Sequence, residues 1–506
     1  MGCGASAASQ KKVNELLEAQ LALVPSNAEL TEKLKSQTDL LANLVKGQHQ
    51  IAHQISSLAD RLPKSDVDVG QKLQPRRSSA DRSSLRLGAV AAPAEISADS
   101  VGALRLEPAI QNYAWGRPWQ TSLVAQLCET KDRPLDRMKS YAEMWMGTHP
   151  NGPASVKLES SDGVGGITAS LKSVISGNPE YWLGRDAWRF KNDLPFLLKV
   201  LSVNQALSIQ AHPHRKLAEY LHDTYPDRYK DANHKPEICL PLGAFEALVA
   251  FRPFAEIQRY IEDMEELQQL CGFGMALSLK DLYGRLMRSN AAKVAEQAKK
   301  LVQRLEQKPK EKRSPEEALV LRLQKDYPGD VGIFSVFFLN YVQIAEDEAH
   351  CFIFCAPDEP HAYLYGDCVE CMSLSDNVVR AGLTPKFKDV ETLLNMMTYR
   401  DDRLPSLVNK GEQVSPGVVK YDPPVEDFLV YEVEGLSRPG EGAQAPLELP
   451  HASICICTSG SFSIDFQTAS SQVEEVRRGQ SFFVRAGSLL HILRAEQGSK
   501  LFVATY

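Results

Sequence analysis

The chain has 506 residues, of which 43% are hydrophobic and 24% charged, a globular composition long enough for about two to four domains. Its formal net charge of -7 argues against a general nucleic-acid-binding protein, which would carry a basic surface. No apolar run approaches the roughly 20 residues that cross a bilayer, and the start lacks a secretory apolar segment. Ten cysteines in so long a chain favour a reducing cytosol over a disulfide scaffold.

The N-terminal part of the chain differs in composition from the rest. Gly2 matches an N-myristoylation pattern and Cys3 is a site for palmitate, so two acyl chains would associate the protein with a membrane. Apolar residues at steps of three, four and seven predict a helical or coiled-coil-like extension over residues 1–62, suited to self-association. Residues 63–102 are rich in Ser, Arg, Ala and Pro and predict a flexible linker. We therefore expect a cytoplasmic protein, with a membrane tether if Gly2 and Cys3 are acylated.

From residue 103 onward, β patterns are interrupted by one helical block. Short strand-like segments over 103–254 predict an antiparallel β domain. Residues 255–327 have helical spacing, and Ser314 followed by proline is typical of a helix start. Strand-like runs over 328–405 return to the first β domain. Short alternating segments over 406–506 predict a second β sandwich or barrel, in which we see no paired ligand set.

Two stretches carry candidate metal ligands. In LSIQAHP, the residues Ser208, Gln210 and His212 alternate with apolar residues, so in a strand they share one face. The segment NHKPE ends in Glu237 next to the apolar run ICLPL, and DEPHAYLYG supplies His361. Two imidazoles, a carboxylate and an amide oxygen form a donor set that suits Zn²⁺ or another first-row ion. The alternative is that each histidine is an ordinary core or loop residue.

Two cysteine pairs suggest a different metal site. Cys351 and Cys355, with Cys368 and Cys371, have spacings that invite a four-cysteine zinc site. Both pairs lie in apolar, strand-like runs, where cysteine behaves as a small hydrophobic residue. We therefore expect four buried thiols at these positions.

Five segments closely resemble the type I phosphomannose isomerase family: NYAWG, YAEMWMGTHP, QAHPHRKLAE, NHKPE and EPHAYLYGDCVECMSLSDNVVRAGLTPKFKDV. The resemblance covers residues from about 103 to 506 and leaves the N-terminal extension outside. It implies a mainly β fold with two cupin-type (jelly-roll) barrels. Residues 103–254 and 328–405 would form the catalytic barrel, 255–327 its helical insertion and 406–506 the second barrel. It also implies one Zn²⁺ per subunit, with ligands at Gln210, His212, Glu237 and His361.

The reaction that this resemblance implies interconverts mannose 6-phosphate and fructose 6-phosphate through a cis-enediol, feeding GDP-mannose synthesis and mannose catabolism. Negative charge develops on the sugar oxygens, and a Lewis acid and a permanent cation stabilise such charge. The family's active-site arginine falls on Arg380. One group must carry the proton between neighbouring carbons, and Glu370, Lys235 and His361 are candidates, with Asp376 a weaker choice. A histidine bound to zinc is a poor base, so we favour Glu370 or Lys235.

Further candidates concern the phosphate and the pocket walls. The phosphate needs donors, for which we expect Ser208, Arg380 and Lys386, with Lys199 a weaker choice. Tyr363 is expected to line the substrate pocket; Glu143 could equally be a buried structural carboxylate.

Two other functions use the same residues. A cupin-type Fe(II) dioxygenase would employ His212, Glu237 and His361 as its two histidines and one carboxylate. A non-catalytic, membrane-tethered scaffold would keep only sugar-phosphate binding. Gln210 as a fourth ligand favours the phosphosugar isomerase over the dioxygenase, as does the pair of cations at Arg380 and Lys386.

Overall fold

The structure is a computed structural model that describes residues 102–158, 167–272, 277–436, 446–467 and 471–506. The predicted acylation site, helical extension and most of the linker lie outside these residues and stay predictions. Among the described residues, no helix combines the length and apolar character needed to cross a membrane.

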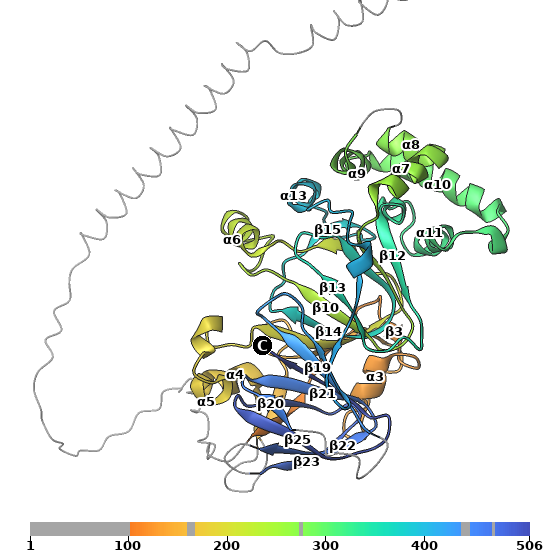
Figure 1. Ribbon diagram of the computed structural model, residues 1–506. Coiled ribbons are helices and arrows are strands. Elements are labelled where there is room, and N and C mark those ends of the chain that lie inside the picture. Colours follow the sequence, from red (N-terminus) through yellow and green to blue (C-terminus); the bar gives the residue numbers. More distant parts are fainter. Residues whose placement is uncertain (1–101, 159–166, 273–276, 437–445, 468–470) are drawn as a thin grey trace, which may run out of the picture. The chain divides into compact units, whose positions relative to one another are not determined.

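An eleven-stranded sheet carries the metal-ligand candidates (Figure 1). Its main path runs β16-β13-β10-β14-β8-β5-β2, and β14 also pairs with β9 and β11, which extend to β15 and β12. β14 pairs with β8 and β10 on the main path and with β9 and β11 beside it, so it brings distant segments of the chain together. The strands are β2 (Ala109–Gln111), β5 (Glu143–Met146), β8 (Phe196–Val203), β9 (Ile209–Ala211), β10 (Glu237–Pro241), β11 (Phe245–Phe251), β12 (Leu339–Ile344), β13 (Cys351–Cys355), β14 (His361–Ser373), β15 (Val379–Gly382) and β16 (Val408–Lys410).

A nine-stranded sheet joins the two ends of the described chain. β1 (Ala103–Glu107) lies between β24 and β6, with Ala103 opposite Val484. Buried apolar residues of this sheet pack against those of the eleven-stranded sheet in one core. The other strands are β6 (Ser155–Leu158), β7 (Ile167–Ser170), β17 (Glu412–Ser415), β18 (Val418–Tyr421), β19 (Leu429–Glu434), β21 (Ser453–Ser459), β24 (Ser481–Val484) and β26 (Lys500–Thr505).

A four-stranded sheet completes the C-terminal β region. Its order is β20-β25-β22-β23, and its apolar residues share a core with the nine-stranded sheet. The strands are β20 (Leu447–Leu449), β22 (Ser461–Gln467), β23 (Val473–Arg477) and β25 (Ser488–Ala495), while β3 (Arg117–Pro118) and β4 (Ser140–Tyr141) form a separate pair. The predicted mainly β fold with a helical insertion is confirmed.

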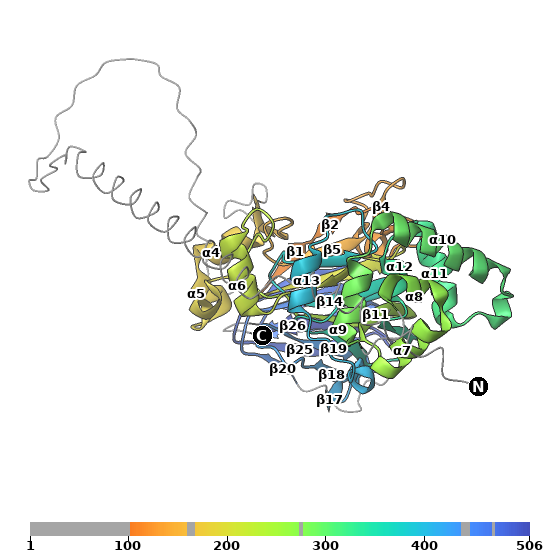
Figure 2. The ribbon, with the colours of Figure 1, turned by 90° about the horizontal axis from the view of Figure 1, so that it is seen from above.

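The inserted helices gather beside β11 and β12 (Figures 1 and 2). Their apolar faces form one core with Ile209, Ala211 and the buried residues of β15. The helices are α7 (Phe254–Asp263), α8 (Glu265–Cys271), α9 (Leu279–Met287), α10 (Ala291–Gln307) and α11 (Pro315–Asp326). Helices elsewhere are α3 (Leu123–Cys128), α4 (Leu171–Gly177), α5 (Pro179–Leu183), α6 (Arg215–Thr224), α12 (Gly332–Ser335) and α13 (Val390–Met396), with 3₁₀ turns at Ala187–Phe190, Lys310–Lys312 and Leu404–Ser406.

One segment of the apolar run before β12 differs from the prediction. Strand was expected from Gly332 onward, but residues 332–335 form α12. A continuous apolar run has no period that separates strand from buried helix. A side chain at Gly332 would meet the backbone nitrogen of Leu383 at 2.6 Å, so the close approach to β15 requires glycine there. By contrast, the cysteine prediction is confirmed, because Cys351, Cys355, Cys368 and Cys371 are all buried.

The predicted start of α11 is also confirmed. The Ser314 hydroxyl accepts a hydrogen bond from Glu317 N, and the Glu317 carboxylate accepts one from Ser314 N, a reciprocal cap. Ser314→Ala is expected to lower the free energy of unfolding by about 1 kcal/mol, measured by urea denaturation. Ser314→Asp keeps an acceptor and should lose less than half of that. Equal losses in the two variants would contradict the capping role.

Candidate metal centre and sugar-phosphate site

Three buried side chains from distant segments converge on one point. His212 follows β9, Glu237 opens β10 and His361 opens β14, and their ligating atoms all lie within 4.8 Å of one another. His212 Nε2 is 3.5 Å from Glu237 Oε1, and His361 Nε2 is 3.3 Å from Glu237 Oε2. They meet because β14 pairs with both β9 and β10.

Hydrogen bonds fix the orientation of both imidazoles. His212 Nδ1 lies 2.6 Å from the carbonyl oxygen of Asn377, and His361 Nδ1 lies 3.3 Å from that of Glu359. A carbonyl only accepts, so each Nδ1–H donates and each Nε2 presents its lone pair to the shared point. Burial lowers the pKa of His212 to about 4, which keeps this ring neutral near pH 7. Both rings therefore have the form that binds a metal.

The atoms that point inward form no hydrogen bond with the described residues. His212 Nε2, Glu237 Oε2 and His361 Nε2 are buried, and none has a hydrogen-bond partner within the described chain. An unsatisfied buried polar atom costs about 1–3 kcal/mol, so three at one point call for a cation. Burial alone would raise the pKa of Glu237, but Lys235, with Nζ at 3.1 Å, and the histidines outweigh it and hold that pKa well below its usual range. The two imidazole nitrogens and one carboxylate thus fit a divalent metal.

Gln210 lies beside this centre as the alternation predicts. Ile209 and Ala211 are fully buried in the core that includes the inserted helices, while Gln210 is half-buried. Gln210 is the cross-strand partner of His361 on one side and of Arg380 on the other. Directly opposed residues share a face of the sheet, so the fourth predicted ligand and the predicted arginine lie next to the metal candidates.

Arg380 is half-buried and lacks a counterion. None of the described residues forms a hydrogen bond or an ion pair with its guanidinium, and burial lowers its pKa. Lys386 is exposed and lines the same cavity of about 410 Å³ as Arg380. Ser208 is half-buried and immediately precedes β9. A cavity with two cations that are free of carboxylate partners suits an anion.

The remaining substrate candidate lies deeper in the fold. Tyr363 is 2% exposed, and its ring lies 6.2 Å from that of His361. Its hydroxyl is 3.8 Å from Cys355 Sγ, inside an apolar core. Tyr363 therefore lies in the apolar core next to His361, and its predicted role in binding substrate stays a prediction.

A buried charge cluster shares a sheet face with Glu237. Lys199 Nζ lies 2.8 Å from Glu370 Oε2 and 3.6 Å from Glu143 Oε2. Glu370 is the cross-strand partner of Lys199 and of Cys239, which is two residues beyond Glu237, so their side chains point the same way. Burial raises the pKa of Glu370 and nearby carboxylates add to this, against the opposing effect of Lys199. The two carboxylates that share Lys199 thus face the metal side of the sheet.

Comparisons with known proteins agree with this geometry. Two family descriptions match: phosphomannose isomerase type I, catalytic domain, over residues 103–254, and its helical insertion domain over residues 256–339. The chain is 38% identical over 417 residues to the mannose-6-phosphate isomerase of Homo sapiens, covering 95% of that protein and 77% of this chain. The chain belongs to the type I phosphomannose isomerase family. Mannose-6-phosphate isomerase 1 of Arabidopsis thaliana is 36% identical over 417 residues, with 93% of it and 79% of this chain covered.

Solved structures of this family share the fold. A zinc-bound holo mannose 6-phosphate isomerase matches with a TM-score of 0.68 and 26% identity, over 80% of this chain and all of that one (100%). A phosphomannose isomerase from Salmonella typhimurium, crystallised as a mutant, matches with a TM-score of 0.69 and 26% identity, over 80% of this chain and 100% of that one. The resemblance read from the sequence motifs is therefore confirmed.

The sequence interpretation missed Asp231, which connects two loops of the phosphomannose isomerase site. Its carboxylate accepts hydrogen bonds from Asn233 N at 2.9 Å, Ser375 Oγ at 2.8 Å and Asp376 N at 2.7 Å. The side-chain amide of Asn377 donates to the Asp231 carbonyl oxygen at 2.7 Å, and the Asn377 carbonyl orients the His212 ring. Its position six residues before Glu237 was the only indication in the sequence of a role for Asp231 in supporting the site. An aspartate in a polar loop is usually solvent-exposed, so the sequence did not predict these hydrogen-bond partners.

Asp231→Asn is expected to weaken Zn²⁺ affinity about tenfold, measured by competition with a chromogenic chelator. The amide keeps one acceptor oxygen but replaces the other by a donor that faces backbone N–H groups. Asp227→Asn, at an exposed position in the same loop, is the matched control. Unchanged affinity in Asp231→Asn would show that the loops hold His212 without this carboxylate.

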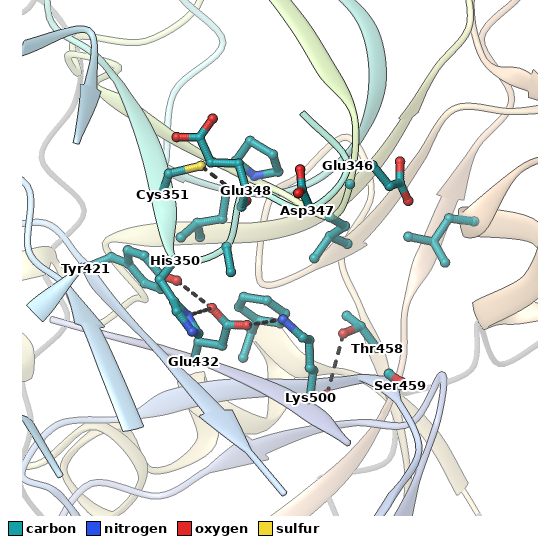
Figure 3. Close-up of a pocket in the computed structure, with 17 residues that line it drawn as sticks. Glu346, Asp347, Glu348, His350, Cys351, Tyr421, Glu432, Thr458, Ser459 and Lys500 are labelled. Carbon is teal, nitrogen blue, oxygen red and sulfur yellow. Dashed lines mark hydrogen bonds and ion pairs between the residues drawn. The ribbon is translucent and has the colours of Figure 1, made fainter. Parts of the chain in front are cut away.

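A second group of potential ligands was also missed. His350, Glu432 and Glu434 approach one another where the C-terminal β region meets the loop before β13. Figure 3 shows His350 and Glu432 of this group. Here the carboxylates already have partners. Lys500 Nζ lies 2.8 Å from Glu432 Oε1 and 3.1 Å from Glu434 Oε1, and the Tyr421 hydroxyl donates to Glu432. The Lys500 ammonium group balances the negative charge of these carboxylates. This cluster therefore does not need a metal ion, unlike the group around Glu237.

Proposed function

We propose that this chain is a zinc-dependent aldose–ketose isomerase that interconverts mannose 6-phosphate and fructose 6-phosphate through a cis-enediol. The observation that carries the proposal is the set of three buried ligating atoms without a hydrogen bond, near an arginine without a counterion. An enzyme at this step would connect fructose 6-phosphate with GDP-mannose synthesis and with mannose catabolism.

Zinc is the metal that we propose for this centre, with His212, Glu237, His361 and Gln210 as its ligands. The imidazoles have a fixed orientation, and Glu237 supplies the negative charge. A solved relative is described as zinc-bound, which supports the choice of metal. When bound, Zn²⁺ supplies Lewis-acid stabilisation of negative charge on the sugar oxygens.

Arg380 supplies the second positive charge that the reaction needs. Its side chain has no acceptor among the described residues, so its N–H groups are available to an enediolate oxygen or to the phosphate. The cavity that it shares with Lys386 accommodates the phosphate end, with Ser208 as a further donor at the start of β9. A guanidinium held at the site before substrate arrives stabilises developing charge without reorganisation.

Glu370 is our choice as carrier of the proton between C1 and C2. A general base works best when its pKa lies near the working pH, and burial raises the pKa of Glu370 toward that range. Lys199 at 2.8 Å holds its position. The other candidate, Lys235, is paired with Glu237 at 3.1 Å and is therefore engaged by a proposed metal ligand.

A coupled assay of the purified full-length chain with mannose 6-phosphate tests the function directly. We expect fructose 6-phosphate to form, and Glu370→Gln to lose most of the turnover while keeping its metal. Absence of turnover together with oxygen uptake on iron loading would instead support the dioxygenase. Substrate binding without either reaction would support the scaffold.

A further inference from the structure

Arg228 lies at the rim of the cavity that contains Arg380 and Lys386. It is exposed and follows α6, and its guanidinium carbon lies 5.1 Å from the ring centre of Phe387 and 5.9 Å from that of Tyr225. Both rings are themselves exposed, Phe387 by 64% and Tyr225 by 46%. Large exposed aromatics are costly in a monomer surface, so their position around one guanidinium points to a role for it.

The stacking leaves the hydrogen-bond donors of Arg228 free. A guanidinium that lies over aromatic faces keeps its N–H groups in its own plane, pointing away from the rings. Within the described chain, no carboxylate or carbonyl accepts from this side chain. The rings thus restrict where the group can move without using its donors.

The cavity of about 410 Å³ has an excess of positive charge. Its charged lining consists of Arg228, Arg380, Lys386 and one acid, Asp389. That acid has other partners, because it accepts from the Tyr229 hydroxyl at 3.1 Å and caps α13 through Thr392 N at 3.2 Å. Three cations whose side chains lack ion pairs therefore surround a space large enough for a phosphate group.

The cavity borders the metal centre through consecutive strand pairings. Arg380 is opposite Gln210, and Gln210 is opposite His361. A hexose bound at the metal therefore has Arg380 at its side, and Arg380 shares its cavity with Lys386 and Arg228. Such a cavity beside the metal suits a sugar 6-phosphate, whose dianionic group is at the opposite end from the reacting carbons C1 and C2.

We propose that Arg228 is a phosphate-binding residue of the sugar-phosphate site, held by Phe387 and Tyr225 so that its N–H groups meet the outer oxygens of the phosphate. The assignment rests on the proposed function and adds a third cation to Arg380 and Lys386, the two that the sequence led us to expect. Arg228 binds substrate and takes no part in proton transfer, so its removal raises KM and leaves kcat nearly unchanged.

The test compares Arg228→Ala, Arg228→Lys, Phe387→Ala and the wild-type full-length protein. Inorganic phosphate is titrated calorimetrically, and KM and kcat are measured with mannose 6-phosphate. We expect Arg228→Ala to weaken phosphate binding and to raise KM, each about five- to tenfold, with kcat within about twofold of wild type. Lysine restores the charge but not the planar donors and gives an intermediate value, as does Phe387→Ala, which frees the guanidinium.

Arg137→Ala is the matched control, because Arg137 is also exposed and stacks on an aromatic ring, that of Trp119 at 4.6 Å, outside this cavity. Unchanged phosphate affinity and KM in Arg228→Ala, or equal changes in Arg137→Ala, overturn the assignment of Arg228. Failure of the proposed function has a different signature: the wild type does not isomerise mannose 6-phosphate, whereas phosphate still binds in an Arg228-dependent manner.

Discussion

Arg380→Ala is expected to lower kcat about 10²- to 10³-fold while the metal content and the fold stay those of the wild type. Arg380 is half-buried without a counterion, so alanine removes an unpaired charge and leaves no carboxylate behind without its partner. Its loss takes away a positive charge that is already in place where negative charge develops. Steady-state kinetics, zinc analysis and circular dichroism on one preparation separate these effects.

Arg380→Lys is the control for charge alone. Lysine keeps the positive charge but presents a single point donor in place of a planar fork, so it should recover only part of the lost kcat. Turnover near the wild-type level in Arg380→Ala would falsify the role that we give to this side chain.

His212→Ala is expected to have the other large effect, a protein that loses zinc on dialysis and retains under about 1% of wild-type activity. The imidazole is fully buried, and its Nε2 atom lies 3.5 Å from Glu237 Oε1 at the point where the ligands converge. Loss of the metal also leaves the buried Glu237 carboxylate without the cation's positive charge, so thermal stability should fall.

His491→Ala serves as its control, since His491 lies on β25, outside the metal centre. That variant should bind zinc and turn over like the wild type. If His212→Ala retained one zinc per chain after dialysis, His212 would not be an essential ligand and other side chains would have to bind the metal.

The sequence predicted those parts of the site that local patterns encode. Alternation placed Gln210 opposite to Ile209 and Ala211, and helical spacing with the Ser314 cap located the insertion. The motifs NHKPE and EPHAY named Glu237 and His361 before any geometry was known. In each case the information lies within a few neighbouring residues.

The rest depends on contacts between distant segments, which a local pattern does not encode. Ala103 pairs with Val484, so the start of the described chain belongs to the sheet of its C-terminal strands. Asp231 contributes through partners more than 140 residues away, as its hydrogen bond to Ser375 shows (separation 144). Arg228 is an exposed arginine in a polar loop, and only folding places it with Arg380 around one cavity.

The most direct test of the central claim combines zinc analysis with the isomerase assay during chelation. Purified protein should contain one zinc per chain, lose interconversion of mannose 6-phosphate and fructose 6-phosphate as a strong chelator removes the metal, and recover when Zn²⁺ is added back. Full isomerase activity in protein shown to be free of zinc and of every other divalent metal would contradict the account.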